Sequence, residues 1–358
     1  MTPTFHKLRI AEINKEANET VSITFTVPSE LINDYTFISG QYLTLRADIK
    51  GEDLRRSYSL SSAPHENTWR VAIKKVENGK FSTYANDVLK AGDEIDVMTP
   101  AGHFHVELNE NNQKSYLLFA SGSGITPIIS IVKSVLKFEP KSNVTLFYGN
   151  KNFGSIIYRE ELEALKNEYM DNFRLIHILS RESLGNQIQK GRIDNEKCEK
   201  LKTAFLNFEK ENTANCEVFV CGPEEMIHAV KNSMLDFGIP SKQIHFELFG
   251  TNVIKKGELG LTEENVHSNV QVIIDGDTLD LALDSNSENI LDAALKAGAD
   301  LPFACKGGVC CTCKAKIIEG TARMDVNYAL EQDELDAGYI LTCQAHPTSE
   351  KLVVSFEE

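Results

Sequence analysis

Four cysteines near the end of the chain have the side-chain type and the spacing of an iron-sulfur site. Cys305, Cys310 and Cys313 stand at C-x4-C-x2-C, and Cys343 follows in the segment YILTCQAHP. Four thiolates at this plant-type spacing hold the two irons of a 2Fe-2S cluster. Adjacent glycines in the loop let the backbone pass close to the cluster sulfurs. The spacing therefore predicts a 2Fe-2S cluster with these four cysteines as ligands.

Zinc binding and disulfide formation are the alternative uses of such a cysteine group. A structural zinc site usually has two C-x2-C pairs, whereas only Cys310 and Cys313 form such a pair here. A disulfide framework is typical of short secreted chains, and the N-terminal residues lack the pattern of a secretory signal. Using Cys311 in place of Cys310 would change the spacing, so Cys311 is interpreted as a bystander thiol. The cluster is the favoured interpretation.

Length and composition describe a globular protein of several domains. The chain has 358 residues, of which 42% are hydrophobic and 25% are charged. That length predicts two or three domains. The longest apolar stretch, residues 116–136, is interrupted by Ser-Gly repeats, Pro127 and Lys133, so it cannot span a bilayer. We expect a cytoplasmic protein.

The negative charge is concentrated at the C-terminal end. Residues 269–358 contain sixteen Asp and Glu against six Lys and Arg, a balance of −10 within a total of −15. A solvated acidic surface is the simple explanation. We favour an acidic module that steers toward a basic partner surface. Nucleic acid is an unsuitable partner at this charge.

The first hundred residues predict a small antiparallel β-barrel. Strand-like segments rich in β-branched and aromatic residues recur at regular spacing. They are HKLRIAEI, TVSITFTV, QYLTLRAD, SYSLSS and WRVAIKKV. A helix is predicted over residues 82–89, with Ser82 as its cap.

One of these strands has side chains that suit a phosphorylated ring system. Arg56, Tyr58 and Leu60 point to one side of the strand, and Ser59 points to the other. A cation, an aromatic face and a hydroxyl can bind a phosphate, stack on a planar ring and hydrogen-bond its edge. A cross-strand Arg–Tyr pair is the simpler alternative. The segment 79–83 adds a glycine before a helix N-terminus, which is a suitable phosphate site.

Residues 108–250 predict a doubly wound α/β domain. Continuous apolar segments, SYLLFAS, VTLFYGN, FRLIHILS and EVFVCGP, are typical of strands buried on both faces. Segments with helical periodicity separate them, namely ITPIISIVKSVLKF, SIIYREELEALKNEY and PEEMIHAVKNSMLDF. Ligands of such domains gather at the carboxyl ends of the strands.

The first strand of this domain ends in a glycine-containing turn. Gly122 and Gly124 permit close approach of a pyrophosphate, and the following helix presents free amides. The turn lacks the third glycine of G-x-G-x-x-G, so a plain strand-to-helix turn is the alternative.

A later strand ends in Ser180 and Arg181. A hydroxyl beside a guanidinium can bind the 2′-phosphate of NADPH, and Arg192 can add a second cation. An arginine in a surface loop is the alternative.

The end of the chain predicts a tether followed by a small ferredoxin-like (β-grasp) domain. Residues 251–268 have few large apolar side chains and are interpreted as a linker. Residues 269–358 then predict a hairpin that turns at residues 275–277 and a helix over residues 290–297. The strands KAKIIEG and KLVVSF complete the fold, with an acidic segment at residues 331–336.

The strand and the helix start in the first domain resemble the ferredoxin–NADP reductase superfamily. Arg56-x-Tyr58-Ser59 and Gly79-x-x-Ser82 are similar to its flavin motifs. The resemblance implies FAD, with Arg56 and Ser82 on the pyrophosphate, Tyr58 against the isoalloxazine and Ser59 near its N5. Ser82 favours FAD over FMN. Further cofactor contacts are implied for Leu60, Val71, Ile73, Lys74, Phe81 and Thr83.

The second domain resembles the same superfamily. Its pyridine-nucleotide motif, GxGxTP, includes Thr126 and Pro127 here. Cys221-Gly222-Pro223 is similar to the next landmark, which implies that Cys221 lies near the nicotinamide. Without the resemblance Cys221 would be interpreted as a buried core thiol. The resemblance also implies that the aromatic segment 246–249 lies near the flavin, and that Tyr58, Ser59 and Cys221 are the catalytic residues.

The three predicted modules together imply an electron-transfer chain. NADPH gives up electrons as a pair and a 2Fe-2S cluster takes them singly, and a flavin can mediate between the two. The domain order resembles that of the reductase components of phenylacetyl-CoA epoxidases, which implies a multi-subunit di-iron oxygenase as the acceptor. A reductase for another oxygenase is one alternative. An electron carrier whose reductase half only binds a nucleotide is the other.

Overall fold

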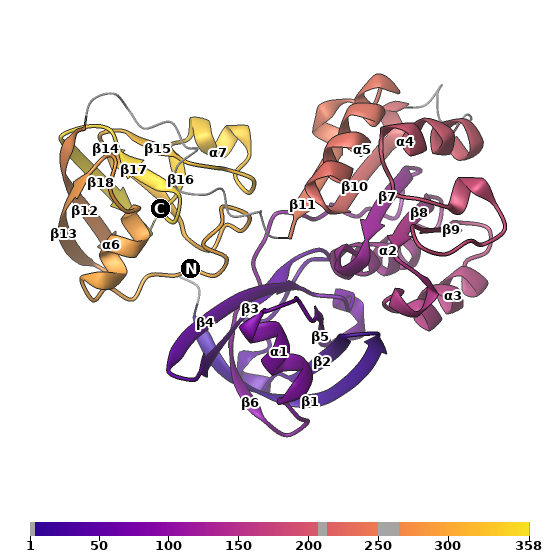
Figure 1. The fold of residues 1–358 in the computed structure, drawn as a ribbon, viewed down its shortest axis with the longest axis horizontal. Coiled ribbons are helices and arrows are strands. Elements are labelled where there is room, and N and C mark those ends of the chain that lie inside the picture. The colour runs from indigo at the N-terminus through magenta and orange to yellow at the C-terminus, as the bar shows by residue number, and fades with distance from the viewer. Residues whose placement is uncertain (1–3, 207–212, 250–264, 358) are drawn as a thin grey trace. The chain divides into compact units, whose positions relative to one another are not determined.

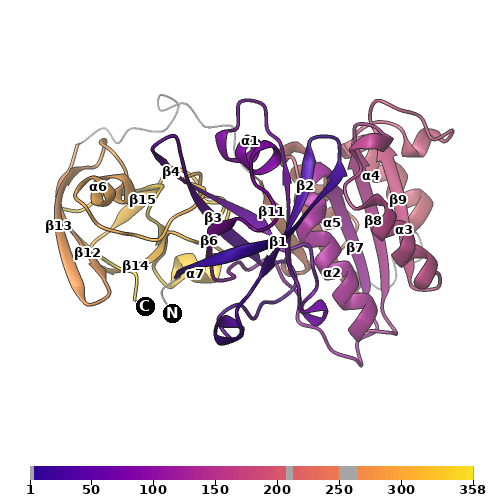
Figure 2. The ribbon, with the colours of Figure 1, turned by 90° about the horizontal axis from the view of Figure 1, so that it is seen from below.

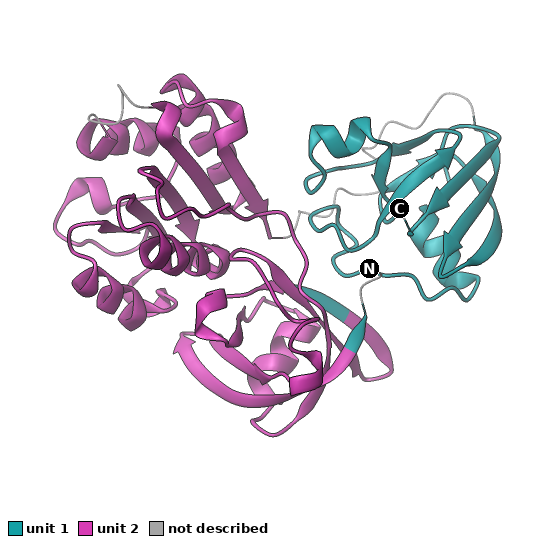
Figure 3. Cartoon of the chain, turned by 180° about the vertical axis from the view of Figure 1, so that it is seen from behind, with its two compact units in different colours: residues 1–5, 55–57, 250–358 teal, residues 6–54, 58–249 magenta. Residues whose placement is uncertain are grey.

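The computed structural model describes residues 4–206, 213–249 and 265–357. The chain forms two compact units (Figure 3). One contains residues 6–54 and 58–249, and the other contains the described parts of 1–5, 55–57 and 250–358. Most of the predicted linker, residues 251–264, lies outside the described residues. Within the described residues, no helix is both long enough and apolar enough to cross a membrane.

The N-terminal residues form a six-stranded antiparallel sheet with the order β4-β3-β6-β1-β2-β5 (Figure 1). The strands are β1 (Phe5–Ala17), β2 (Thr20–Thr26), β3 (Tyr42–Ile49), β4 (Glu52–Ser59), β5 (Trp69–Lys74) and β6 (Glu94–Met98). Directly after β4, Leu60 pairs with Val71 of β5 in an antiparallel bridge. The two edge strands therefore meet, and the sheet closes as a barrel closes. The predicted barrel is confirmed, but β6 was not predicted.

The helix beside the barrel begins earlier than predicted. Helix α1 spans Lys80–Asp87, and its N-cap is Gly79 rather than Ser82. The Ser82 hydroxyl instead accepts a hydrogen bond of 3.0 Å from the Val76 amide. A serine hydroxyl can bond to a neighbouring backbone amide as readily as it can cap a helix. The prediction of a Ser82 cap was therefore wrong.

The second half of this unit is a five-stranded parallel sheet with the order β11-β10-β7-β8-β9. Its strands are β7 (Ser115–Ser121), β8 (Asn143–Asn150), β9 (Phe173–Leu179), β10 (Cys216–Gly222) and β11 (Ile244–Leu248). Figure 2 shows β7, β8 and β9 side by side, as their register requires. The predicted parallel sheet is confirmed, and β11 is an additional strand.

Helices connect these parallel strands. They are α2 (Ile125–Phe138), α3 (Arg159–Glu168), α4 (Asn195–Leu201) and α5 (Glu224–Asp236). The predicted bounds of α2 are confirmed, whereas α3 is shorter than predicted and α4 was not predicted. Alternate β7 residues, such as Tyr116 and Leu118, pack with α2 in one core. Phe119 faces the other way and stacks on Phe147, which in turn contacts Phe205 edge-on. The sheet is therefore buried on both faces.

The C-terminal unit has a five-stranded sheet with the order β13-β12-β18-β14-β16 and a two-stranded sheet of β15 and β17. Its strands are β12 (His267–Ile274), β13 (Asp277–Asp284), β14 (Lys314–Glu319), β15 (Ala322–Met324), β16 (Tyr339–Leu341), β17 (Ala345–Pro347) and β18 (Lys351–Ser355). Asp275 and Gly276 both have positive φ, as the predicted hairpin turn requires. Helices α6 (Ile290–Lys296) and α7 (Gln332–Asp336) complete the unit.

Candidate functional site

The end of β4 presents the predicted flavin residues in different environments. Arg56 is exposed and Tyr58 is half-buried, whereas Ser59 is 2% exposed. The Tyr58 ring lies 5.9 Å from the Phe81 ring of α1, measured between centroids. Strand β4 therefore carries an exposed cation and, two residues later, an aromatic ring that packs beside the start of α1.

Four other predicted flavin contacts are core residues of the barrel. Their side chains pack in one hydrophobic cluster, with exposures of 2% or less. These residues are Leu60, Val71, Ile73 and Phe81. Their predicted contacts with the flavin stay predictions.

The turn before α1 is tightly built. A Cβ on Gly79 would lie 2.5 Å from the Ser82 Oγ, so only glycine fits there. Ser82 is 6% exposed, and Thr83 donates its amide to the Gly79 carbonyl over 3.0 Å. The Ser82 hydroxyl is thus engaged in the turn. Its predicted contact with a pyrophosphate stays a prediction.

The glycine-containing turn after β7 packs against the end of β10. A Cβ on Gly124 would lie 2.1 Å from the carbonyl oxygen of Cys221, which a real side chain cannot tolerate. Gly122 has φ +55°, and its carbonyl accepts a bond of 3.0 Å from the Tyr148 hydroxyl. Thr126 donates its hydroxyl to the Ser123 carbonyl over 3.0 Å. The turn is therefore a rigid concave backbone suited to a pyrophosphate.

Strands β7 and β10 are each followed closely by the start of a helix. Gly222 ends β10, and Pro223 is the N-cap of α5. Pro127 lies in the first turn of α2, where its missing amide hydrogen costs no helix bond. Both helix starts are thus at the carboxyl edge of the parallel sheet, where the sequence predicted them.

Ser59, Cys221 and Glu247 lie close together where the barrel joins the parallel sheet. The Ser59 hydroxyl donates to Glu247 Oε2 of β11 over 3.1 Å. Burial raises the pKa of Glu247 to about 8, and the bond from Ser59 opposes this. Burial and the charge of Glu247 raise the pKa of Cys221, which is fully buried. Cys221 is therefore a neutral thiol and not a nucleophile.

Lys74 lies at the nucleotide turn rather than deep in the barrel. Its Nζ is 3.6 Å from the point where a Gly122 Cβ would stand. Burial and the charge of Lys151 lower the pKa of Lys74. A cation beside a backbone turn favours an anion there. Lys151 was not predicted as a site residue.

The two predicted 2′-phosphate arginines lie on adjacent segments. The Gly191 amide donates to the Leu179 carbonyl over 2.9 Å, and Lys190 pairs with Leu179. The segment with Arg192 thus runs beside the end of β9, which continues into Ser180 and Arg181. Arg192 lines a cleft of about 620 Å³ that Ser180 and Arg181 do not line. Both arginine side chains are exposed.

The four predicted cluster thiols lie together. Cys310 Sγ donates to Cys305 Sγ over 3.1 Å. Hydrogen bonds from Cys310 and Cys343 lower the pKa of Cys305 to about 2, which favours the thiolate that binds metal. The contact with Cys305 raises the pKa of Cys310 and Cys343. These thiols are hydrogen-bonded to one another and form no disulfide. In the described residues, no set of three or more His, Cys, Asp or Glu side chains is arranged to hold a metal ion.

The donor set nevertheless has the chemistry of a 2Fe-2S cluster, with four convergent thiols and supporting donors. The Gly307 amide donates to Cys305 Sγ over 3.3 Å, and the Gln344 side chain donates to Cys343 Sγ over 3.6 Å. Cys311 Sγ donates instead to the Ala329 carbonyl over 3.3 Å. Cys311 thus bonds to a backbone carbonyl, as its interpretation as a bystander leads us to expect.

Glu247 is a half-buried carboxylate beside Ser59 that the sequence analysis did not single out. It was named only as part of the aromatic segment 246–249. No local signal marks it, because its burial arises from the pairing of β11 with β10. A carboxylate between two apolar positions of a short strand is otherwise a common surface pattern.

Three family profiles match the chain in the order of its domains. An oxidoreductase FAD-binding domain matches residues 7–106, and an oxidoreductase NAD-binding domain matches residues 118–232. A 2Fe-2S iron-sulfur cluster binding domain matches residues 272–348. The FAD, NAD and 2Fe-2S modules predicted from the sequence are thereby confirmed.

Relatives match over nearly the whole chain. A component of the 1,2-phenylacetyl-CoA epoxidase of Escherichia coli (strain K12) is 42% identical over 99% of this chain and 98% of its own length. The ferredoxin reductase component of 3-ketosteroid-9-alpha-monooxygenase from Rhodococcus rhodochrous is 31% identical over 98% of this chain and 96% of its own. The chain belongs to the family of oxygenase reductase components with FAD-binding, NAD-binding and 2Fe-2S domains.

Solved structures share the fold. Phthalate dioxygenase reductase superimposes with a TM-score of 0.60 and 23% identity, covering 98% of each chain. A type IV self-sufficient cytochrome P450 monooxygenase superimposes with a TM-score of 0.71 and 20% identity, covering 98% of this chain and 41% of the other. The three modules therefore have a common architecture in proteins of low sequence identity.

Proposed function

We propose that this chain takes electrons from NADPH, by way of FAD and a 2Fe-2S cluster, to a multi-subunit di-iron oxygenase that epoxidises phenylacetyl-CoA. The observation that carries the proposal is the 42% identity to the 1,2-phenylacetyl-CoA epoxidase component over 99% of the chain. The order of the three modules supports it. By the same similarity, the proposed pathway is phenylacetate breakdown and the proposed location is the cytoplasm.

The proposed functional modules are residues 1–107 for FAD, 108–250 for NADPH and 269–358 for the cluster, with 251–268 as a linker. The balance of −10 in residues 269–358 supports docking on a basic surface of the oxygenase. Electrostatic steering of this kind weakens as ionic strength rises. Electron delivery is therefore expected to slow at high salt.

The flavin is proposed to lie along β4 and the turn before α1. Arg56, Ser82 and the amides near Gly79 would bind its pyrophosphate, Tyr58 would lie against the ring system, and Ser59 would lie near N5. The exposed guanidinium of Arg56 and the half-buried ring of Tyr58 support this placement. A flavin, when bound, accepts an electron pair and releases single electrons to a one-electron centre.

NADPH is proposed to bind across the turn after β7 and the ends of β9 and β10. The backbone of Gly122 and Gly124 would receive the pyrophosphate with Lys74, and Ser180, Arg181 and Arg192 would bind the 2′-phosphate. Cys221 would place its small, neutral side chain beside the nicotinamide. The Gly124–Cys221 packing supports this role, because it brings the turn after β7 against the end of β10.

Anaerobic titration with NADPH tests the proposal. The purified protein is expected to show flavin and cluster absorbance, and both should bleach on addition of NADPH. The reduced protein should then support epoxidation of phenylacetyl-CoA by the purified oxygenase. A flavin that stays oxidised would favour the electron-carrier alternative. Bleaching without epoxidation would retain the reductase and reject the proposed acceptor.

A further inference from the structure

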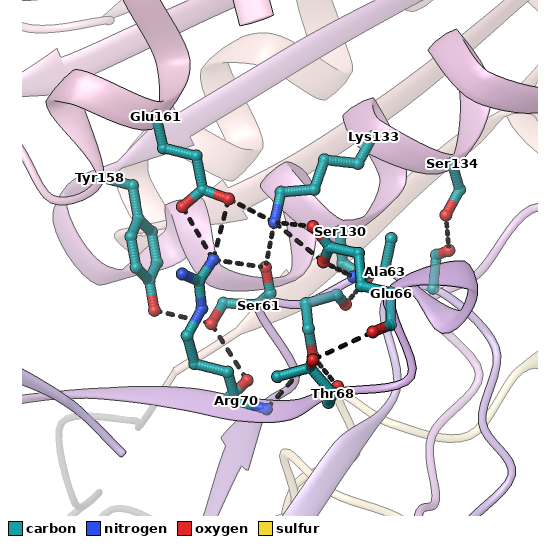
Figure 4. Close-up of polar contacts among 12 residues, drawn as sticks. Ser61, Ala63, Glu66, Thr68, Arg70, Ser130, Lys133, Ser134, Tyr158 and Glu161 are labelled. Atoms are coloured by element: carbon teal, nitrogen blue, oxygen red, sulfur yellow. Dashed lines mark hydrogen bonds and ion pairs between the residues drawn. The ribbon is translucent and has the colours of Figure 1, made fainter. Parts of the chain in front are cut away.

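A chain of four alternating charges, which includes the buried Lys133, crosses the boundary between the barrel and the parallel-sheet domain (Figure 4). We call it the ion chain, and it consists of Glu66, Lys133, Glu161 and Arg70. Glu66 ends the short helix η2 (Pro64–Glu66) of the barrel, and its carboxylate lies 3.0 Å from Lys133 Nζ of α2. Lys133 also pairs with Glu161 of α3. Glu161 in turn accepts two bonds from Arg70 of β5, of 2.9 and 2.8 Å.

Lys133 is the member of the ion chain that is costly to bury, whereas the Glu66 side chain is 34% exposed. The Lys133 side chain is 5% exposed, while those of Arg70 and Glu161 are 21% and 27% exposed. A buried charge is tolerated only when it is paired, and apolar side chains of similar volume often stabilise a fold as well or better. Because positive and negative side chains alternate, each of the four is paired with at least one opposite charge. An arrangement of this kind is better suited to fixing one geometry than to adding stability.

Hydroxyl groups reinforce the same boundary next to the flavin strand. Ser61 and Tyr158 share a hydrogen bond of 2.6 Å, and Ser130 of α2 donates to the Ser62 carbonyl over 2.6 Å. Ser61 and Ser62 follow the flavin strand β4 by two and three residues. Together with the Ser59–Glu247 bond, residues 59–62 are tied to three different elements of the parallel-sheet domain.

Tyr158 is held in an unfavourable backbone conformation at this boundary. Its φ is 57°, in the left-handed region that a bulky residue rarely adopts. The Arg70 guanidinium covers its ring at 4.5 Å from the centroid. Such strain persists only where the surroundings over-determine the conformation. The hydrogen bond between Tyr158 and Ser61 is therefore formed at the cost of a strained backbone conformation at Tyr158.

Two members of the ion chain, Lys133 and Arg70, lie on elements that lead to the proposed cofactor sites. Helix α2, which contributes Lys133, begins directly after the Gly122–Gly124 turn. Strand β5, which contributes Arg70, continues to Lys74 at the same turn. We propose that Lys133, Glu161 and the hydroxyls around them are positioning residues that hold the flavin strand and the nucleotide turn in the register needed for flavin reduction. This inference rests on the proposed placement of FAD and NADPH.

Replacing Lys133 by methionine tests the inference, because it keeps the length of the side chain and removes the charge. Loss of positioning is expected to slow flavin reduction at saturating NADPH by between about 10-fold and 100-fold, since small misplacements of reacting groups are costly. Flavin content and the dissociation constant for NADP⁺ should change much less. The charge-transfer absorbance formed when NADP⁺ is added to the dithionite-reduced protein should decrease, because it reports ring stacking without turnover.

Lys114→Met is the matched control, because Lys114 pairs with Glu217 over 2.9 Å inside the parallel-sheet domain. It should leave both the reduction rate and the charge-transfer absorbance unchanged. Lys133→Arg should restore most of the rate. A Lys133→Met protein with a lower melting temperature but normal rate and charge-transfer absorbance would overturn the inference and leave the proposed function intact.

A milder variant covers the case in which Lys133→Met does not fold. Ser130→Ala removes one neutral bond to the Ser62 carbonyl and leaves the ion chain in place. Its reduction rate is expected to fall several-fold with flavin content unchanged, and a normal rate would overturn the inference. If the unaltered protein itself shows no flavin reduction by NADPH, the proposed function fails first.

Discussion

The cluster site and the flavin–nucleotide site are assembled differently. Three of the four cluster thiols come from one loop, and the fourth, Cys343, lies between the short strands β16 and β17. The proposed flavin–nucleotide site draws Ser59, Cys221 and Glu247 from β4, β10 and β11, which belong to two different domains. One site is encoded by local spacing, and the other exists only once two domains have packed.

The two kinds of assembly predict different responses to substitution. A ligand set that comes mostly from one loop is lost when a single thiol is removed, and the rest of the molecule need not respond. A site assembled across a domain boundary depends on packing and on buried charges such as Lys133, so distant substitutions reach it. Variants at the two sites should therefore separate flavin reduction from cluster reduction.

Cys343→Ser should have the largest effect, and it should be confined to the cluster. A hydroxyl is a poor substitute for a thiolate ligand, so the cluster absorbance should be lost while NADPH still reduces ferricyanide. Cys311→Ser is the matched control and should retain the cluster, because Cys311 Sγ bonds to a backbone carbonyl. Visible spectra and iron content measure both. An intact cluster in Cys343→Ser would reject Cys343 as a ligand.

Gly124→Ala should have the next largest effect, in the other site. The added methyl would lie 2.1 Å from the Cys221 carbonyl oxygen, so the nucleotide turn must move. We expect NADPH-dependent ferricyanide reduction to fall by more than about 10-fold, with cluster absorbance unchanged. Gly149→Ala is the control, since its nearest neighbour would be 3.4 Å away. Equal activity of the two variants would show that the turn tolerates displacement.

Arg181→Ala should discriminate between the two nicotinamide nucleotides. Loss of a charge-assisted bond to the 2′-phosphate is expected to raise KM for NADPH by about 10-fold to 100-fold, and KM for NADH much less. Arg174→Ala, in the same strand region but at the start of β9, serves as the control. Steady-state kinetics with both nucleotides measure the effect. Equal losses with NADPH and NADH would remove the 2′-phosphate assignment.

Glu247→Gln should give the smallest effect, visible in pH dependence. The pKa of Glu247 is raised from 4.5 to about 8, so the folded state holds a proton that the unfolded state releases. This contribution to stability is complete below about pH 4.5 and is lost as the pH rises to about 8. Melting temperatures across that range should fall more steeply for the unaltered protein than for Glu247→Gln. Parallel curves would show that Glu247 titrates normally.

The sequence predicted most elements whose pattern is local. The strand segments of the parallel sheet, the bounds of α2 and the turn at Asp275–Gly276 follow from apolar periodicity and turn chemistry, and the structure agrees. The missed elements include β6, β11, α4 and the strands β15, β16 and β17, all of which are short. Strand β6 takes its place through pairing with strands distant in the sequence. The cap of α1 was wrong because Ser82 has a competing partner in the preceding turn.

By itself, the sequence determined the kinds of chemistry present: four thiols at cluster spacing, an Arg-x-Tyr-Ser strand, and glycines where a phosphate turn needs them. Each is a short-range pattern, so each can be recognised without a fold. Tertiary structure alone decided that Glu247 meets Ser59, that Lys74 at the end of β5 lies at the nucleotide turn, and that Lys133 joins two carboxylates across a domain boundary. Those contacts join residues distant in the chain, and their energies depend on burial, which no local pattern encodes.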